Sequence, residues 1–136
     1  MYKTILIPVD LGHTEAVAKM IDVARKLGDS NARIALCNVL WDIPEYVLVE
    51  LPSEIGTKAE EEAEAGLTAI ATENGLDPDI HIVHGQPAGA IMGLAEKLGA
   101  ELIVVASHKP GLQDLFIGST AARIVSHAKC CVHVIR

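Results

Sequence analysis

Long apolar runs are missing from this chain of 136 residues. A membrane-spanning helix needs roughly 20 consecutive apolar residues, and no stretch of the sequence approaches that length. The apolar stretch near the N-terminus stops at Val9 and is followed by Asp10, which makes it too short and too quickly acidic for a signal peptide. We therefore expect a cytoplasmic protein that does not insert into a membrane.

Cysteine is also scarce. Cys37 stands in an apolar, strand-like pattern, whereas Cys130 and Cys131 are adjacent to each other. Three cysteines without a Cys-x-x-Cys spacing argue against a disulfide framework and against a zinc site. We expect three buried free thiols.

Positive charge is in deficit, because 11 lysine and arginine residues face 18 aspartate and glutamate residues, for a net charge of −7. Binding to a nucleic acid backbone needs clustered lysine and arginine, so we do not expect a nucleic acid partner. A single nucleotide stays compatible with this composition, since it responds to the local charge of its site rather than to the sum.

The apolar residues make up 50% of the chain and predict one globular domain over residues 1–136. Short apolar runs alternate with helical patterns, which predicts an α/β domain of parallel strands with helices on both faces. The expected strands are Thr4–Asp10, Arg33–Leu40, Asp79–His84, Leu102–Ala106 and Cys131–Arg136. The expected helices are one capped by Thr14 and stopped by Gly28, then Ser53–Asn74, then one from Pro87 to a stop at Gly99, and finally Ser119–Ala128. Between the second strand and the second helix, residues 41–56 are expected to form an irregular excursion.

The segment that follows the fourth strand carries the chemistry. Gly118 would let a ligand approach the backbone closely, and Ser119 or Thr120 could cap the last helix. Free N–H groups and the helix dipole favour a phosphate at such a helix start, although a bare structural cap is an equal alternative. In a parallel sheet, ligands bind beyond the carboxyl ends of the strands, where the strand order reverses. Those ends carry Asp10, residues 39–40, Gly85 and Ser107.

Catalytic machinery is not evident in the sequence, which has no Walker lysine loop, no paired carboxylates and no nucleophile–base pair. Asp10 and His108 are the acid–base candidates, yet Asp10 could cap the following loop and His108 could be an ordinary loop residue. His81 and His84 are three apart on a strand, so they point to opposite faces and cannot chelate one metal ion together.

Several motifs resemble the universal stress proteins in order and over essentially the whole chain: the opening TILIPVD, GQP after the third strand, ASHKPG followed by GSTAARIVSHA, and the closing strand. The resemblance implies a single three-layer Rossmann-like domain with a five-stranded parallel sheet in the order 3-2-1-4-5. It also implies a crevice between the first and fourth strands.

Nucleotide binders of this family carry Gly-x2-Gly-x9-Gly-Ser/Thr after the fourth strand. Here Ala106 replaces the first glycine, residues 109–111 occupy the region of the second, and residues 118–119 keep the end, as in the subgroup with Ser-His-Lys/Arg-Pro. The resemblance implies a site for ATP, ADP or AMP, with magnesium or manganese. The implied site consists of Pro8, Val9, Asp10, Val39, Gly85, Ala106, Ser107, His108, Lys109, Pro110, Gly111, Gly118, Ser119 and Thr120.

Roles follow from the same resemblance. Asp10 would lie near the ribose or a metal-bound water, and the backbone of Val39 would meet the adenine edge. Residues 107–111, with Ser119 and Thr120, would hold the phosphates.

Three functions remain open at this point: a nucleotide-binding stress regulator with little or no turnover, a slow ATPase, and a nucleotide-free dimerisation module. The apolar last strand, Cys131–Arg136, is an edge strand in the implied order and is expected to pair with a second copy of the chain.

Overall fold

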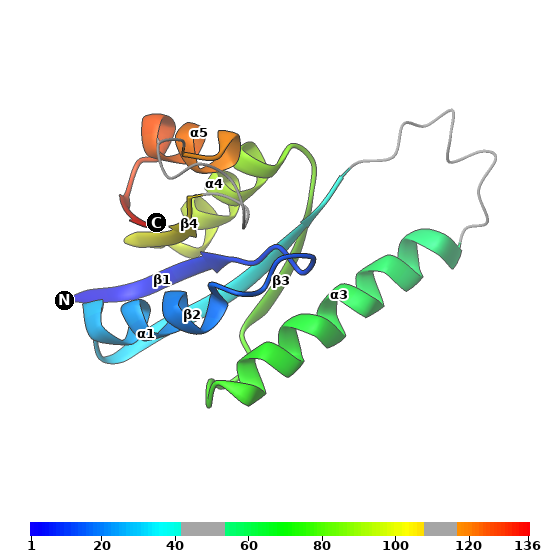
Figure 1. Cartoon of the computed structure of the whole chain (residues 1–136), viewed down its shortest axis with the longest axis horizontal. Coiled ribbons are helices and arrows are strands. Elements are labelled where there is room, and N and C mark those ends of the chain that lie inside the picture. Colours follow the sequence, from blue (N-terminus) through cyan, green and yellow to red (C-terminus); the bar gives the residue numbers. More distant parts are fainter. Residues whose placement is uncertain (42–53, 108–116) are drawn as a thin grey trace.

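The computed structural model describes residues 1–41, 54–107 and 117–136. Its elements are β1 (Tyr2–Pro8), α1 (Val17–Leu27), β2 (Gly28–Leu40), α3 (Glu54–Glu73), β3 (Ile80–His84), α4 (Pro87–Leu98), β4 (Leu102–Ala106), α5 (Ser119–His127) and β5 (Cys131–Ile135). The five strands form one parallel sheet in the order β3-β2-β1-β4-β5 (Figure 1). The predicted fold class and strand order are confirmed.

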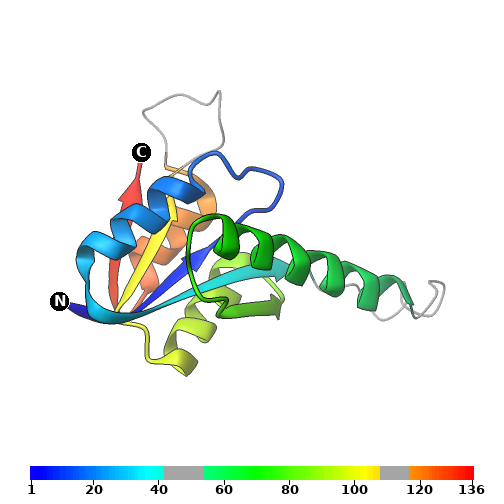
Figure 2. The same ribbon diagram turned by 90° about the horizontal axis from the view of Figure 1, so that it is seen from below.

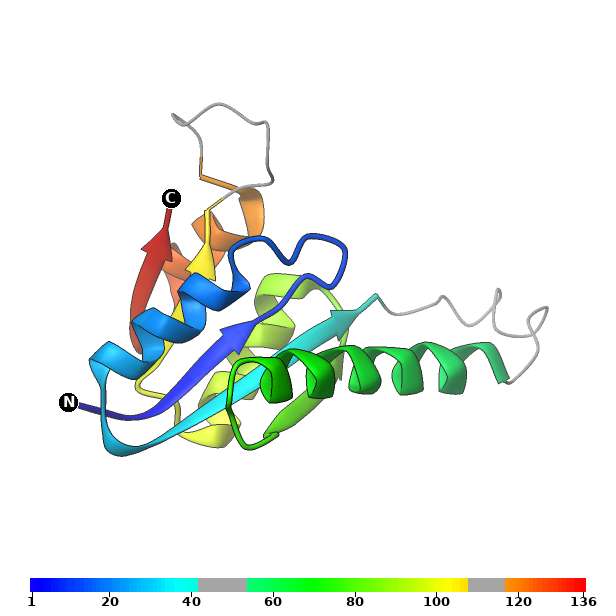
Figure 3. The ribbon, with the colours of Figure 1, turned by 60° about the horizontal axis from the view of Figure 1, so that its bottom comes forward.

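Helices cover both faces of the sheet. Figure 3 shows α1 and α3 on one side, with α4 and α5 on the other. The alternation of side chains along β1 explains why both faces are apolar, because Ile5 and Ile7 enter the α1–α3 core while Leu6 enters the α4–α5 core. All three of these side chains are fully buried, so β1 lies at the centre of the domain.

The sheet opens between β1 and β4. Their pairing joins Ile5 with Leu102 and Leu6 with Ile103, which lie in the middle of β1 and at the amino end of β4. The N–H of Val9 donates to the Cys37 carbonyl of β2, so the backbone nitrogen of the preceding residue, Pro8, faces β4. Since proline has no N–H to donate, Pro8 cannot extend the β1–β4 ladder, in which Leu6 is the last paired residue of β1.

The starts of two helices differ from the prediction. Thr14 does not cap α1; its carbonyl accepts from the Val17 N–H over 3.2 Å in a turn that delays the helix, whose N-cap is Ala16. Ser119 and Thr120 do not cap α5 either, because its N-cap is Gly118, without a side-chain hydrogen bond.

Gln86 and Pro87 start α4 as the sequence indicates, with Pro87 in the first turn and the Gln86 Oε1 accepting from the Gly89 N–H over 2.8 Å. Gly99 ends this helix in the left-handed conformation, with φ of 67°.

Strand β2 begins at Gly28, earlier than the predicted Arg33.

The edge strand β3 is tied to its surroundings by polar contacts. His81 Nε2 lies 2.8 Å from Asp79 Oδ1, and Arg33 also contacts Asp79. The guanidinium of Arg33 is the main cause that lowers the pKa of Asp79. His84 Nε2 instead lies 2.8 Å from Glu60 Oε1 of α3. The two histidines of β3 therefore contact different carboxylates, which agrees with the prediction that they point to opposite faces of the sheet. Figure 2 shows that α3 continues past the sheet.

The prediction of three buried thiols is wrong in part. Cys37 is buried, and burial raises the pKa of its thiol to about 12. Cys130 is half-buried and Cys131, at the start of the edge strand β5, is exposed.

Of the helices in the described ranges, none has the length and apolar character that a bilayer span requires.

Candidate functional site

A pocket of about 690 Å³ lies at the carboxyl ends of β1, β2 and β4, where the strand order reverses. Its volume falls in the range of small-molecule sites. The described residues that line it are Pro8, Val9, Asp10, His13, Ala16, Val17, Met20, Cys37, Asn38, Val39, Trp41, Pro87, Ile91, Val105, Ala106, Ser107, Gly118, Ser119, Thr120, Ala121 and Ile124. The structure therefore brings together, in one concavity, most of the residues that the sequence proposes for the site.

The end of β1 contributes Pro8, Val9 and Asp10. Val9 is buried, and its N–H donates to Cys37, so the backbone is held firmly up to this point. Asp10 is exposed, and its two carboxylate oxygens have different partners. Oδ1 accepts from the Gly12 N–H over 3.0 Å, whereas Oδ2 lies 3.1 Å from His13 Nδ1. Asp10 thus holds the following turn and also presents a carboxylate at the pocket.

The end of β2 contributes Asn38, Val39 and Trp41. The side-chain amide of Asn38 donates to the Val9 carbonyl over 2.9 Å and ties β2 to β1 at the floor of the pocket. Trp41 follows the last residue of β2 and is 69% exposed. Sequence reasoning missed Asn38 and Trp41 as site residues, although a lone tryptophan directly after a strand that ends at the expected crevice was a usable indication.

The end of β4 and the start of α5 are joined by the backbone. Ser107 is buried, its N–H donates to the Ile135 carbonyl over 2.8 Å, and its carbonyl accepts from the Gly118 N–H. The Gly118 carbonyl accepts from Ala122 over 2.8 Å and opens the helical ladder. The first N–H groups of a helix have no acceptor within it, and Ser119 and Thr120, at the start of α5, line the pocket wall.

Some predicted site residues are not part of this arrangement. Gly85 is absent from the lining; its N–H donates to the Leu40 carbonyl over 3.0 Å, and its φ of 122° shapes the turn from β3 into α4. His108, Lys109, Pro110 and Gly111 lie outside the described residues.

The polar groups of the described lining are few. Asp10 is its one carboxylate, and it contains neither lysine nor arginine. Across residues 1–41, 54–107 and 117–136, no three His, Cys, Asp or Glu residues gather to hold a metal ion. A metal ion here would therefore depend on Asp10 together with ligand oxygens and water, as the prediction of a water-mediated contact requires.

A second pocket, of about 250 Å³, lies between the carboxyl-terminal ends of α4 and α5 and is lined in part by Cys130. Lys129 and Glu96 form an ion pair of 3.1 Å at its wall. Its volume is below the roughly 300 Å³ at which small-molecule sites begin. The larger pocket at the sheet's switch point is therefore the candidate site.

A model of the universal stress protein family matches residues 1–136. The chain belongs to this family. It is 30% identical over 142 residues to universal stress protein G of Escherichia coli O157:H7, with all of both chains covered. Among solved structures, the hypothetical protein MJ0577 is 27% identical, with 99% of this chain and 96% of that chain covered and a TM-score of 0.80.

Two more distant members of the family share the fold and were solved with nucleotides. One is a universal stress protein in complex with cAMP, which is 22% identical with a TM-score of 0.64 and coverage of 99% and 97%. The other is the Archaeoglobus fulgidus protein in complex with dAMP, which is 18% identical with a TM-score of 0.67 and coverage of 99% and 98%.

Proposed function

We propose that this universal stress protein binds an adenine nucleotide in the pocket between β1 and β4 and acts as a stress-response regulator. The ligand is ATP, ADP or AMP, and binding changes the contacts of the protein with a second copy or another protein. The observation that carries the proposal is the convergence of Asp10, Val39 and the start of α5 on one pocket of about 690 Å³. The complexes of distant members with cAMP and dAMP support the choice of an adenine nucleotide.

The pocket offers different chemistry to each part of a nucleotide. Pro8, Val9 and Val39 give the base an apolar wall, and the backbone of Val39 meets the adenine edge. The Asp10 carboxylate can accept from both ribose hydroxyls or from a water molecule on Mg²⁺ or Mn²⁺.

The phosphates take the other end of the pocket. They lie against Ala106, Ser107 and the N–H groups of Ser119 and Thr120, where the helix dipole favours negative charge. Gly118 keeps a side chain away from them. Residues 108–111 and Gly85 complete the proposed site, as the family resemblance implies.

Turnover of the nucleotide is expected to be slow or absent. In the described lining, Asp10 and His13 are the acid–base candidates, and they are already engaged with each other at 3.1 Å. Efficient hydrolysis needs a base within reach of an attacking water and cationic groups on the leaving phosphate. The protein is therefore proposed to be a binding regulator rather than an ATPase.

The direct test is native mass spectrometry of the purified protein, followed by calorimetry with ATP, ADP and AMP in the presence of Mg²⁺ or Mn²⁺. An adenine nucleotide that copurifies, or micromolar affinity, is the expected result. If the wild-type protein binds no adenine nucleotide with either metal ion, it is instead a nucleotide-free dimerisation module.

A homodimer through residues 131–136 belongs to the same proposal, because β5 is an edge of the sheet. A cytoplasmic location and the absence of a nucleic acid partner stay predictions from the sequence.

A further inference from the structure

Trp41 is the only tryptophan in the chain, and the packing of the domain uses little of it. Its 69% exposure contrasts with the usual role of a tryptophan side chain, which buries a large apolar area in a core or at an interface. It is also the only tryptophan, tyrosine or phenylalanine in the described lining of the pocket. An exposed indole ring at the wall of a binding pocket is suited to cover a planar ligand.

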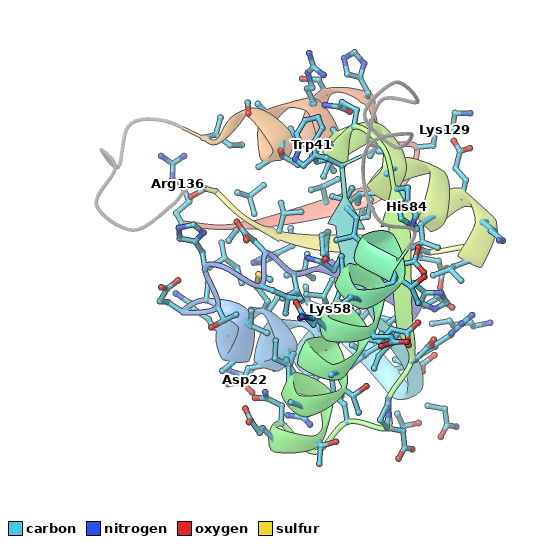
Figure 4. All side chains as sticks on the ribbon, turned by 90° about the vertical axis from the view of Figure 1, so that its right-hand side faces the viewer. Asp22, Trp41, Lys58, His84, Lys129 and Arg136 are labelled. Carbon is cyan, nitrogen blue, oxygen red and sulfur yellow. The ribbon has the colours of Figure 1, made fainter. Side chains whose placement is uncertain are left out.

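The backbone of β2 explains why the ring belongs to the pocket. Side chains two apart on a strand point to the same face, so Trp41 continues the row of Cys37 and Val39. Cys37 is buried in the α4–α5 core, Val39 packs against that core, and all three residues line the pocket. Figure 4 shows Trp41 on the α4–α5 side of the sheet.

The rest of the pocket decides which part of a ligand the ring would meet. Pro87 and Ile91 of α4 line the same pocket and add apolar surface. The polar groups come from other elements, with Asp10 after β1 and Ser119 at the start of α5. A phosphate or ribose gains nothing from an apolar wall, whereas a heterocyclic base gains both burial and stacking.

We infer that Trp41 stacks on the base of the bound nucleotide and makes the pocket selective for purine over pyrimidine nucleotides. The two fused rings of a purine offer the indole a larger face than the single ring of a pyrimidine, so stacking favours the purine. This inference rests on the proposed nucleotide site and adds to it the residue that recognises the base.

Calorimetry of variants tests the inference. Stacking of one base on an aromatic side chain corresponds to roughly 5- to 150-fold in affinity, so Trp41→Ala is expected to weaken ATP binding by about tenfold or more. Trp41→Phe keeps a ring and should retain most of the affinity. Inorganic tripolyphosphate with Mg²⁺ lacks a base, so it should bind equally to the wild type and to Trp41→Ala. Val125→Ala removes a half-exposed apolar side chain of α5 outside the pocket and should leave ATP binding unchanged.

Intrinsic fluorescence gives a second readout, since Trp41 is the sole tryptophan. ATP is expected to change the emission of the wild type with the same midpoint as calorimetry, whereas tripolyphosphate should leave the emission unchanged. CTP is expected to bind more weakly than ATP to the wild type, and that difference should shrink in Trp41→Ala.

Failure of this inference is distinguishable from failure of the proposed function. If Trp41→Ala binds ATP as tightly as the wild type does, or if ATP binds without changing the emission, stacking by Trp41 is overturned while the nucleotide site stands. If the wild type binds no nucleotide at all, both are overturned.

Discussion

Gly118 connects the loop of the site to α5 through its backbone. Its N–H donates to the Ser107 carbonyl, and its own carbonyl accepts from the Ala122 N–H. Both backbone groups are therefore engaged, and what Gly118 offers a ligand is the space left by the missing side chain. Its φ of −62° and ψ of 154° are open to any residue. Backbone strain therefore does not require a glycine here, and in the proposed complex its role would be to let the phosphates approach closely.

Gly118→Val is expected to lower ATP affinity at least tenfold, about 1.4 kcal/mol, because the new side chain occupies room beside the phosphates. The fold should survive, since valine tolerates this backbone conformation. Calorimetry and thermal unfolding check the two expectations. The matched control is Gly93→Val in α4, which lies outside the pocket and where an added Cβ meets no atom within 4 Å apart from its chain neighbours and the backbone of its own helix. Undiminished ATP affinity in Gly118→Val would move the phosphates elsewhere.

Asp10 combines a structural contact with the proposed ribose or metal contact. Asp10→Asn keeps an oxygen that can accept from the Gly12 N–H, so the turn should persist. The variant loses the charge, which is expected to cost roughly 1.5–3 kcal/mol of ATP binding in calorimetry. Asp22→Asn, at an exposed position of α1 outside the pocket, is the control for the loss of one negative charge. Equal affinity in Asp10→Asn and the wild type would reduce Asp10 to a residue that holds the turn.

At the scale of elements, β5 is the last strand of the sheet, and among the described residues only β4 pairs with it. The N–H of Cys131 donates to the Glu101 carbonyl, and the Ile135 carbonyl accepts from Ser107, so odd-numbered residues of β5 bond to β4. By alternation, the N–H groups of Val132 and Val134 point to the open edge. A second copy of the chain could pair there without any change in the ladder within the domain.

Val134→Pro is therefore expected to separate the proposed dimer while the domain stays folded. It removes an outward N–H, and the β4–β5 ladder does not use that group. Sedimentation at tens of micromolar should give a dimer for the wild type and a monomer for the variant, with circular dichroism as the check of folding. Val134→Ala retains the N–H and should remain dimeric. A monomeric wild type under these conditions would end the proposal of a β5 dimer.

At the scale of the whole molecule, Cys37 reports unfolding. Its side chain has no exposed surface, and burial raises its pKa to about 12, so it reacts with a thiol reagent only after the domain opens. A ligand that binds only the folded state at 100 times its Kd adds about 2.7 kcal/mol to the free energy of unfolding. Cys37 also lines the pocket, so bound ATP would cover it directly as well as stabilise the fold. ATP at that concentration should therefore slow the alkylation of Cys37 by at least about 100-fold, as followed by mass spectrometry.

The exposed thiol of Cys131 is the internal control for this experiment. Because residues 131–136 form the proposed dimer contact, the comparison is made in the monomeric variant Val134→Pro, where Cys131, outside the pocket lining, should react at the same rate with and without ATP. Labelling of Cys37 as fast as that of Cys131 in the folded protein would contradict the buried position. Labelling of Cys37 that ATP does not slow would contradict stabilisation by the nucleotide.

The local pattern of apolar and polar residues was sufficient to predict the helices and strands of the fold. Short apolar runs predicted the first, second, fourth and fifth strands, because a strand covered on both faces has no polar face. The third strand was predicted instead from its alternation of polar and apolar residues, which is typical of a half-exposed edge strand. The helix that starts at Pro87 and ends before Gly99 was predicted within a residue, because its stop and start depend on the backbone properties of those residues themselves. The strand order came from the resemblance to the family, since periodicity does not say which strands are neighbours.

The tertiary structure alone decided the positions that depend on distant neighbours. Thr14 and Ser119 have capping chemistry, yet the surrounding turns start both helices elsewhere. Cys131 is exposed because its strand is an edge of the sheet. Trp41 joins the pocket because β2 ends beside β1 and α4, which are far from it in sequence. A sequence specifies which face of an element is apolar, but the elements that meet at that face are chosen by the packing of the whole chain.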